Sequence, residues 1–298
     1  MATDYRLKFT TLDVFTSTRY IGNPLAIVHV PPSIKLTQDE KQRVAREFNF
    51  SETVFHHEDT VPAVIDIFTT TEELPFAGHP TVGTGFYLLS KASPTVENVT
   101  LRTKAGDIPV VRTDSGGARL QVPIDFKEHA PQRIGSVKQQ PGLKDTDYVN
   151  GREGAEACAS IVKGMTFLLL ELASEDALGR MQPYAQRLEI PNKEEVLGEW
   201  GVGFQGVYAF YEDGGRVRTR MFDAALEDPA TGSAASALGG FLGRRKGLGV
   251  HEFQIVQGVE MGRRSEIRVR VEIGEDGEVR KIELEGEAVE VMQGVLNV

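Results

Sequence analysis

One segment of the chain occurs twice, and this repeat limits the folds that the chain can adopt. The two copies span residues 67–90 and 221–244, so corresponding positions lie 154 residues apart. Identical residues at this spacing include Phe68 and Phe222, Pro75 and Pro229, Gly78 and Gly232, Gly85 and Gly239, and Leu88 and Leu242. The offset extends to the next apolar run, where Leu101 corresponds to Ile255. The chain is therefore predicted to consist of two similar halves.

Each copy has the pattern of a strand, a short loop and a helix. An apolar run predicts the strand, and the helix begins at a glycine followed by a polar residue. In the first copy, Val82, Phe86 and Leu89 recur at helical spacing. Both helices are rich in Gly, Ala, Ser and Thr, which allow neighbouring backbones to approach closely. We therefore expect each half to be a sheet curled around one central helix.

The starts of these two helices are candidate binding sites for an anion. The first turn of a helix presents unpaired N–H groups and the positive end of the helix dipole, which suit a carboxylate or a phosphate. Two such ends, at Gly78 and Gly232, facing each other across a cleft between the halves, would suit a small anionic substrate. The alternative is that both glycines serve only as caps and packing positions, since glycine is common where helices begin.

Composition restricts the partners of the chain. Its 33 Lys and Arg residues against 43 Asp and Glu residues make it acidic, which disfavours nucleic acid and anionic membranes as partners. No apolar run approaches the roughly 20 residues of a membrane helix, and the N-terminus lacks the pattern of a signal peptide. A cytoplasmic protein is therefore expected. Cys158 is the single cysteine, which excludes an internal disulfide and a cysteine-cluster metal site.

Two short motifs resemble a nucleotide site and a metal site, but their predicted secondary structure does not suit either ligand. Residues 201–206 match GxGxxG, but a nucleotide-binding fingerprint follows a strand and opens a helix, whereas this motif follows a helical stretch and opens a strand. His56 and His57 are neighbours in a predicted strand, so their side chains point to opposite faces and do not converge on one metal ion. We interpret them as a solvated surface pair. The six histidines show no HxxxH or HExxH spacing, so a metal site lacks support.

The rest of the chain is predicted to be rich in strands. A hairpin of strands near 8–15 and 25–30 precedes a capping box at 37–40, which opens a helix that ends at Asn49. Further elements are predicted as strands near 166–170, 207–211, 217–222 and 265–273 and as helices over 178–187 and 192–197. Residues 130–150 are rich in Pro, Gly, Gln and charge and lie near the expected linker. The expected domains are 1–130 and 131–298, and the last segment is a candidate to pack back on the first half.

Four groups of residues, in this order, resemble the phenazine-biosynthesis PhzF-like family, which has the fold of diaminopimelate epimerase. They are residues 13–15 with 22–26, 49–53, 73–81 and 228–234. The resemblance covers nearly the whole chain. It implies an α+β protein of two pseudo-twofold-related domains, each a mostly antiparallel curled sheet around one central helix. It also implies a homodimer and catalysis without a metal or an organic cofactor.

The resemblance also assigns roles to particular residues. Glu52, which alone would be interpreted as a solvated edge residue, matches the acid/base glutamate of the family's Asn-x-Ser-Glu-Thr motif. His79 matches the histidine of the Gly-His-Pro motif. Asp228 and Ser233 match the Asp-Pro-Ala-Thr-Gly-Ser motif, and in the family these three residues surround the substrate and orient or polarise it. The family's best-known reaction is the isomerisation of trans-2,3-dihydro-3-hydroxyanthranilate by movement of a proton.

The same resemblance excludes a neighbouring chemistry. Epimerases and proline racemases of this fold use two thiols, one at each helix start. Here those positions hold Ala77 and Thr231, and Cys158 lies at neither of them. A racemase that works through two thiolates is therefore not available to this chain.

We expect Glu52 to remove a proton from one carbon and return it to another on the same face of the substrate. Burial would raise its pKa toward the working pH, because desolvation disfavours the charged carboxylate. Candidate apolar walls are Phe50, Val54 and Phe76.

Polar groups of the helix starts complete the expected site. Ser233 and the N–H groups at Gly78 and Gly232 would hold a carboxylate or stabilise developing negative charge. His79 and Asp228 would hydrogen-bond other polar groups of the substrate.

Alternatives remain for the residues and for the function. His79 is alternatively a cap residue paired with Glu72 or Glu73, and Asp228 alternatively holds its loop through an Asx turn. The first functional hypothesis is a cofactor-independent isomerase acting on a small cyclic or unsaturated amino acid or hydroxy acid. The second is a lyase or epimerase on a related small acid, and the third is a non-catalytic ligand-binding dimer. The substrate itself depends on loops that the sequence does not translate into a ligand.

Overall fold

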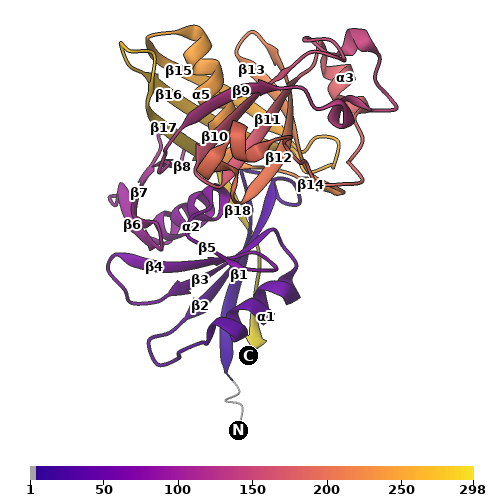
Figure 1. Cartoon of the computed structure of the whole chain (residues 1–298). Helices are drawn as coiled ribbons and strands as arrows, with labels where there is room; N and C mark the ends of the chain where they lie inside the picture. Colours follow the sequence, from indigo (N-terminus) through magenta and orange to yellow (C-terminus); the bar gives the residue numbers. More distant parts are fainter. Residues whose placement is uncertain (1–4) are drawn as a thin grey trace. The chain divides into compact units, whose positions relative to one another are not determined.

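The computed structural model describes residues 5–298, which fall into two units (Figure 1). Unit 1 contains the chain up to Gln121 together with Leu284–Val298, and unit 2 contains Val122–Glu283. The chain thus passes from one unit to the other at 121–122, before the expected boundary at 130–131, and the last segment belongs to unit 1. Among the described residues, no helix has both the length and the apolar character that crossing a membrane requires.

Unit 1 is a mostly antiparallel sheet with a helix on each face. Its strands are β1 (Arg6–Val14), β2 (Asn23–Val30), β3 (Glu52–His57), β4 (Ala63–Phe68), β5 (Glu73–Leu74), β6 (Asn98–Thr103), β7 (Gly106–Arg112), β8 (Ala118–Gln121) and β18 (Ala288–Asn297). Its helices are α1 (Gln38–Phe48) and α2 (Gly78–Lys91). The strands pair in the order β18, β1, β2, β3, β4, β6, β7, and the pairs β2–β3 and β4–β6 are parallel.

Unit 2 repeats this order. Its strands are β9 (Lys127–Gln132), β10 (Glu156–Val162), β11 (Met165–Glu171), β12 (Phe204–Asp213), β13 (Arg216–Asp223), β14 (Leu226–Asp228), β15 (Gly249–Gln257), β16 (Ser265–Ile273) and most of β17 (Val279–Gly286). Its helices are α3 (Glu175–Arg180), α4 (Lys193–Val196) and α5 (Gly232–Lys246). The strands pair in the order β9 to β13, then β15 and β16, with β11–β12 and β13–β15 parallel.

The strand registers confirm the repeat that the sequence predicts. Thr53 pairs with Phe68 in unit 1, and the residues 154 positions later, Val207 and Phe222, pair in unit 2. The pairs Ala63–Leu101 and Val217–Ile255 correspond in the same way, as do Ile67–Leu74 and Met221–Asp228. The two units therefore share one fold, and the expected α+β class with curled, mostly antiparallel sheets is confirmed.

The small residues of the two central helices allow close packing. A Cβ atom added at Gly83 of α2 would lie 2.6 Å from a methyl group of Leu25 and 2.7 Å from one of Val14. One added at Gly239 of α5 would lie 2.7 Å from a methyl group of Val269. Only glycine permits these approaches. Gly239 corresponds to Gly85 of α2, where an added Cβ atom would lie 2.6 Å from a methyl group of Val110, so both helices depend on a glycine that the sequence repeats.

The capping box and the predicted hairpin are also confirmed. The Glu40 N–H donates to Thr37 Oγ1, and the Thr37 N–H donates to Glu40 Oε2 at 2.7 Å. Helix α1 is capped at its C-terminus by Asn49, whose φ of 52° is left-handed and turns the chain out of the helix. This turn brings the chain to the start of β3 at Glu52.

The predicted helix over 178–187 is wrong beyond its first turn. Helix α3 starts earlier, with Ser174 as its N-cap, and ends at Arg180. Pro183 explains the early end, because the residue before a proline is disfavoured in the helical conformation. The other predicted helix, over 192–197, is present as the short α4.

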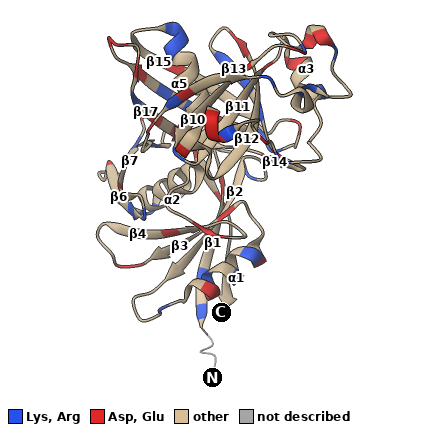
Figure 2. Ribbon diagram, in the orientation of Figure 1, with Lys and Arg blue, Asp and Glu red and all other residues tan. Residues whose placement is uncertain are grey.

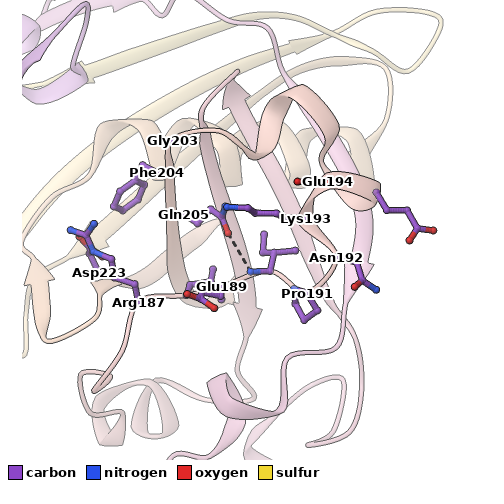
Figure 3. A pocket seen from close by; sticks show the side chains of 13 residues that line it. Arg187, Glu189, Pro191, Asn192, Lys193, Glu194, Gly203, Phe204, Gln205 and Asp223 are labelled. Atoms are coloured by element: carbon purple, nitrogen blue, oxygen red, sulfur yellow. Dashed lines mark hydrogen bonds and ion pairs between the residues drawn. The ribbon is translucent and has the colours of Figure 1, made fainter.

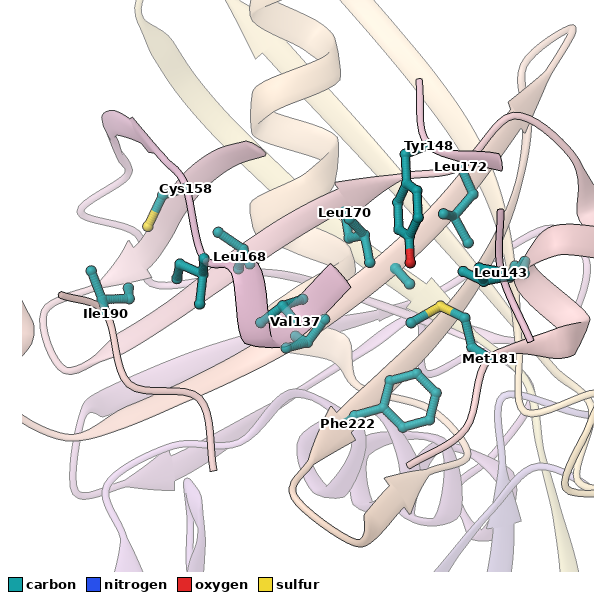
Figure 4. Close-up of a cluster of buried hydrophobic side chains, with 14 of the residues drawn as sticks. Val137, Leu143, Tyr148, Cys158, Leu168, Leu170, Leu172, Met181, Ile190 and Phe222 are labelled. Carbon is teal, nitrogen blue, oxygen red and sulfur yellow. The ribbon is translucent and has the colours of Figure 1, made fainter. Parts of the chain in front are cut away.

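Residues 130–150, which composition associates with the linker, belong to unit 2. They contain part of β9 and two short 3-10 turns, and they contribute to a buried apolar cluster (Figure 4). The contributing residues are Ile134, Val137, Leu143 and Tyr148. Their irregular spacing produces no periodic pattern, so the burial of this segment becomes visible only in the structure.

Candidate active site

Glu52 and His79 come together within unit 1. Glu52 is the first residue of β3 and lies beside Leu25 of β2. Its Oε2 atom is 3.2 Å from Nδ1 of His79, and 16% of the Glu52 side chain and 4% of the His79 side chain are exposed. The carboxylate and the imidazole therefore form a largely buried pair that connects the start of β3 with the start of α2.

His79 is the second residue of α2, which begins with the sequence Gly-His-Pro. The N-cap residue, Ala77, has no side-chain group that could accept a hydrogen bond from the first turn. The N–H group of Gly78 precedes the first intrahelical bond, so helix geometry directs it to an acceptor outside the helix. The start of α2 thus combines a positive dipole end with the Glu52–His79 pair.

Burial raises the pKa of Glu52 to about 7, although a hydrogen bond from Ser51 acts in the opposite direction. Burial is the larger effect because it removes water from the charged carboxylate. Near neutral pH both the acid and the base forms of Glu52 are then populated. This is the property required of a group that takes a proton and gives it back.

The structure contradicts the alternative in which His79 pairs with Glu72 or Glu73. The Glu73 carboxylate binds Lys104 Nζ at 2.5 Å and accepts a hydrogen bond from Gln38. Glu72 is exposed and contributes its backbone carbonyl to the Thr69 turn. The partner of His79 is the carboxylate of Glu52.

Of the three candidate walls around Glu52, Val54 has the clearest support. It is fully buried and, two residues along β3, lies on the same face as Glu52. Phe50 and Phe76 are half-buried, and the Phe50 ring packs against Phe48 of α1 with 6.0 Å between ring centroids.

The other predicted residues come together within unit 2. Asp228 is the last residue of β14, and its Oδ2 atom accepts a hydrogen bond from Thr231 Oγ1 at 2.5 Å. Gly232 and Ser233 open α5, where Gly232 is buried and Ser233 is half-buried. Asp228 thus bonds within its own loop through the Thr231 side chain, which is not the backbone contact of an Asx turn. This contact places its carboxylate beside the first turn of α5.

The interpretation of His56 and His57 as a solvated surface pair is wrong. Both are half-buried, and they make contacts on opposite faces of β3. His57 Nε2 is 2.7 Å from the Asp66 carboxylate, which also binds Lys41, whereas the His56 ring lies against the His29 ring at 6.1 Å. Within residues 5–298, no group of three or more His, Cys, Asp or Glu side chains is arranged to hold a metal ion.

A separate cavity of about 860 Å³ lies in unit 2 beside the start of β12 (Figure 3). It is lined by residues of the segment 187–195 and by Gly203, Phe204, Gln205 and Asp223. Part of the GxGxxG motif therefore lines a cavity, but the motif opens a strand, as predicted, and so lacks the helix that a nucleotide site needs. None of the predicted site residues lines this cavity.

Comparison with known proteins identifies the family. Residues 12–294 match the family described as phenazine biosynthesis-like protein. The chain belongs to this family. It is 33% identical over 272 residues to an uncharacterized isomerase of Pasteurella multocida, covering 89% of this chain and 86% of that protein. It is 30% identical over 298 residues to the trans-2,3-dihydro-3-hydroxyanthranilate isomerase of Pseudomonas aeruginosa, covering 96% of this chain and 98% of that enzyme.

Solved structures agree with this placement. A PhzF-family phenazine biosynthesis protein of Bacillus anthracis matches with a TM-score of 0.77 and 24% identity, covering 99% of this chain and all of that one. A hydroxyproline epimerase of Agrobacterium vitis matches with a TM-score of 0.57 and 12% identity, covering 98% and 93%. These structures share the fold, and the named relatives are isomerases. The chain is therefore an enzyme of the isomerase class with an epimerase-like fold.

The sequence pattern did not single out Gln257, which contacts the segment that carries Asp228, or Tyr208, which contacts Gln257. A signal existed in the repeat. Both residues are polar at positions whose counterparts 154 residues earlier, Thr103 and Val54, are smaller or apolar.

Proposed function

We propose that this protein is a cofactor-independent isomerase that moves a proton on a small cyclic or unsaturated amino acid or hydroxy acid. A single acid/base group, Glu52, carries the proton. The observation that supports this most directly is the buried Glu52 carboxylate, 3.2 Å from His79 and with a pKa raised to about 7.

In the proposed reaction the base form of Glu52 breaks a C–H bond and takes the proton, while the electron pair enters the adjacent unsaturated system. The same proton then forms a C–H bond at a second carbon on the same face, which regenerates the Glu52 base. Substrate and product are isomers, so the step needs no oxidant or reductant. His79 orients the Glu52 carboxylate and hydrogen-bonds the substrate.

The proposed substrate is anionic and is held by local groups. The proposed binding groups for anionic parts of a substrate are the Gly78 N–H at the start of α2 and the Gly232 N–H and Ser233 hydroxyl at the start of α5, because each helix start presents a positive dipole end. Asp228 hydrogen-bonds an amino or hydroxyl group of the same molecule. The net charge of −10 makes such local binding groups necessary.

Similarity to the Pseudomonas aeruginosa isomerase makes trans-2,3-dihydro-3-hydroxyanthranilate the first compound to test. The alternative reactions are elimination or epimerisation of a related small acid in the same site. A non-catalytic ligand-binding dimer is the remaining alternative. Because Ala77 and Thr231 occupy the helix starts, a two-thiol racemase is not among the proposals.

We further propose a cytoplasmic homodimer that needs no metal and binds neither nucleic acid nor membranes. Figure 2 shows positively and negatively charged residues interspersed along both units, in keeping with a protein that does not bind a polyanion. Light scattering after gel filtration tests the dimer, and a monomeric mass for active protein would contradict it.

Proton exchange in deuterated water tests the proposed reaction. Wild-type protein, Glu52→Gln and Glu285→Gln are each mixed with the dihydrohydroxyanthranilate and related acids and followed by NMR. Glu285 is a matched control, because 15% of its side chain is exposed and it belongs to the same unit. Deuterium should enter a carbon position with wild type and Glu285→Gln. Exchange by Glu52→Gln at more than a tenth of the wild-type rate would contradict the role of Glu52.

A further inference from the structure

A fully buried polar cluster lies against the segment that joins β14 to α5. Its members are Tyr208 on β12, Thr219 on β13 and Gln257 on β15, each with 0% of its surface exposed. Thr219 and Gln257 are register partners on adjacent parallel strands. The Tyr208 hydroxyl lies 3.0 Å from Thr219 Oγ1 and 2.9 Å from Gln257 Oε1. The Oε1 atom of Gln257 is therefore hydrogen-bonded by two hydroxyl-bearing residues, Tyr208 and Thr219.

The other contacts of Gln257 reach the Asp228 segment. Its Nε2 group donates to the Asp228 carbonyl oxygen at 2.7 Å and to Thr231 Oγ1 at 3.1 Å. Its Oε1 atom accepts from the Thr231 N–H at 3.4 Å. Both ends of one amide thus bind the backbone and side chain of the residues that immediately precede α5.

These bonds give the Asp228 carboxylate a defined orientation. Thr231 Oγ1 accepts a hydrogen bond from Gln257, so its own proton is directed to Asp228 Oδ2, which lies at 2.5 Å. The Asp228 carboxylate is the acceptor at the end of this chain of bonds. The direction of each bond is set by the Gln257 Nε2 group, which can only donate.

The corresponding positions of unit 1 show that the fold does not need this cluster. The residues 154 positions before Tyr208, Thr219, Asp228, Thr231 and Gln257 are Val54, Ile65, Leu74, Ala77 and Thr103. Four of the five are apolar, and the Thr103 hydroxyl serves its own hairpin by donating to the Gly106 carbonyl. Unit 1 builds the same strands without these polar groups, so their hydrogen-bonded arrangement in unit 2 indicates a role beyond packing.

We propose that Gln257, held by Tyr208 and Thr219, is a positioning residue that orients the Asp228 carboxylate and the first turn of α5 toward the substrate. This inference rests on the proposed function of Asp228 and Ser233. Gln257 acts through Asp228 and Thr231 and does not itself touch the substrate.

Two variants remove the interaction with little change of shape. Tyr208→Phe deletes only the hydroxyl, and Gln257→Met keeps the length of the side chain and deletes the amide. Tyr148→Phe is the matched control. Tyr148 is 3% exposed in the same unit, and its hydroxyl donates to the Lys138 carbonyl at 2.8 Å, outside the cluster. If Gln257→Met fails to fold, Tyr208→Phe still tests the inference.

The kinetic measurement compares kcat and KM of these variants with the substrate that wild type turns over. We expect kcat to fall about tenfold for Tyr208→Phe and about 10²-fold for Gln257→Met, because misplacing an orienting group by about 1 Å has effects of this size. Tyr148→Phe should keep kcat within about twofold, since it loses a comparable hydrogen bond remote from the cluster. Cluster variants that match the control in kcat would overturn the inference.

A structural measurement separates this inference from the proposed function. The backbone amide NMR signals of Thr231, Gly232 and Ser233 should shift in Tyr208→Phe and stay in place in Tyr148→Phe, with no substrate present. Unchanged signals in Tyr208→Phe overturn the inference, whatever the activity. If wild type turns over none of the acids tested, the proposed function fails, and the same signals still decide whether the cluster positions the start of α5.

Discussion

The two units share one strand order but differ at the positions that carry the candidate chemistry. Glu52 of unit 1 corresponds to Gly206 of unit 2, at the same offset of 154 residues. A Cβ atom added at Gly206 would lie 2.8 Å from the Phe204 ring, so an aromatic side chain occupies the space next to that position. Unit 2 therefore has no carboxylate at the site equivalent to the acid/base residue of unit 1.

At one position before the central helix, it is unit 2 that carries a carboxylate and unit 1 that does not. Asp228 of unit 2 corresponds to Leu74 of unit 1, and Ser233 corresponds to His79. Unit 1 buries one carboxylate, which raises its pKa, whereas unit 2 holds a carboxylate through a chain of hydrogen bonds. Under the proposed function, the two copies of one scaffold are specialised, one for proton transfer and one for orientation. This favours a single-base mechanism over a symmetric two-base mechanism.

The largest expected effect of a substitution is that of Glu52→Gln on catalysis. It removes the base and keeps the shape, so kcat/KM should fall by about 10²–10⁴-fold. Steady-state kinetics at neutral pH measure this loss, with circular dichroism to verify folding. An equal fall in Glu285→Gln would show that the loss is not specific to Glu52.

The next largest effect concerns a segment that exists only in unit 2. Residues 133–155 join β9 to β10, whereas the corresponding strands of unit 1, β18 and β1, are not consecutive. Lys138 Nζ lies 2.6 Å from the Glu156 carboxylate, with 2% and 1% of the two side chains exposed. Lys138→Met should lower the free energy of unfolding by about 3–5 kcal/mol, because it leaves a buried carboxylate unpaired.

Urea denaturation measures the effect of Lys138→Met. Lys163→Met is the control, since Lys163 pairs with Glu199 in the same unit but half of its side chain is exposed. The control should leave the free energy of unfolding nearly unchanged. Adding Glu156→Gln to Lys138→Met should recover part of the loss, and an equal loss in the two single lysine variants would contradict the role of burial.

The raised pKa of Glu52 predicts two opposite dependences on pH. The pKa is about 7 in the folded protein against 4.5 ordinarily, so the native state binds the extra proton between these values. Stability from this group is present below pH 4.5 and is lost as pH rises to about 7, a decrease of about 3 kcal/mol. Activity rises over the same pH range as the base form appears.

Measuring both profiles in one buffer series checks this prediction. Wild-type kcat/KM should rise with pH with an apparent pKa near 7, while the stability difference between wild type and Glu52→Gln should shrink as pH falls toward 4.5. An apparent pKa near 4.5 in the kinetic profile would show that the substrate-free site is not desolvated.

Gly206→Ala is the counterpart of Glu52→Gln in unit 2. It should lower the stability of the protein and leave its activity nearly unchanged. The added methyl group meets the Phe204 ring, so we expect a loss of about 1–3 kcal/mol in the free energy of unfolding. The kcat should stay within about twofold, because this position carries no candidate chemistry. Thermal unfolding and kinetics together check it, and a loss of activity without a loss of stability would contradict the comparison.

The smallest expected effect is that of Ser233→Ala. It removes one hydroxyl from the proposed carboxylate site, worth about 1 kcal/mol, while the helix N–H groups remain. We therefore expect KM to rise by about fivefold at nearly constant kcat. Substrate titrations compare Ser233→Ala with wild type and with the control Ser236→Ala. Ser236 is a suitable control because its hydroxyl is buried and donates to the Gly232 carbonyl within α5. A larger rise for Ser236→Ala would place the effect in the helix itself.

Much of the fold could be predicted because its signals are local or repeated. The capping box at Thr37 and the two central helices follow from side chains that lie within a few residues of each other. The repeat of 154 residues predicted two similar halves, and the register pairs of both units confirm it. The helix over 178–187 could not be placed correctly from apolar spacing, because the conformational effect of Pro183 outweighed it.

The candidate residues were found by motif, but their contacts were not. The sequence by itself determined the repeat, the family and the identity of Glu52, His79, Asp228 and Ser233. Only the tertiary structure decided that Glu52 faces His79 rather than solvent, that residues 133–155 pack into a core, and that Gln257 holds the Asp228 segment. The physical reason is that burial and hydrogen bonding between distant strands depend on register and packing, which sequence neighbours do not encode.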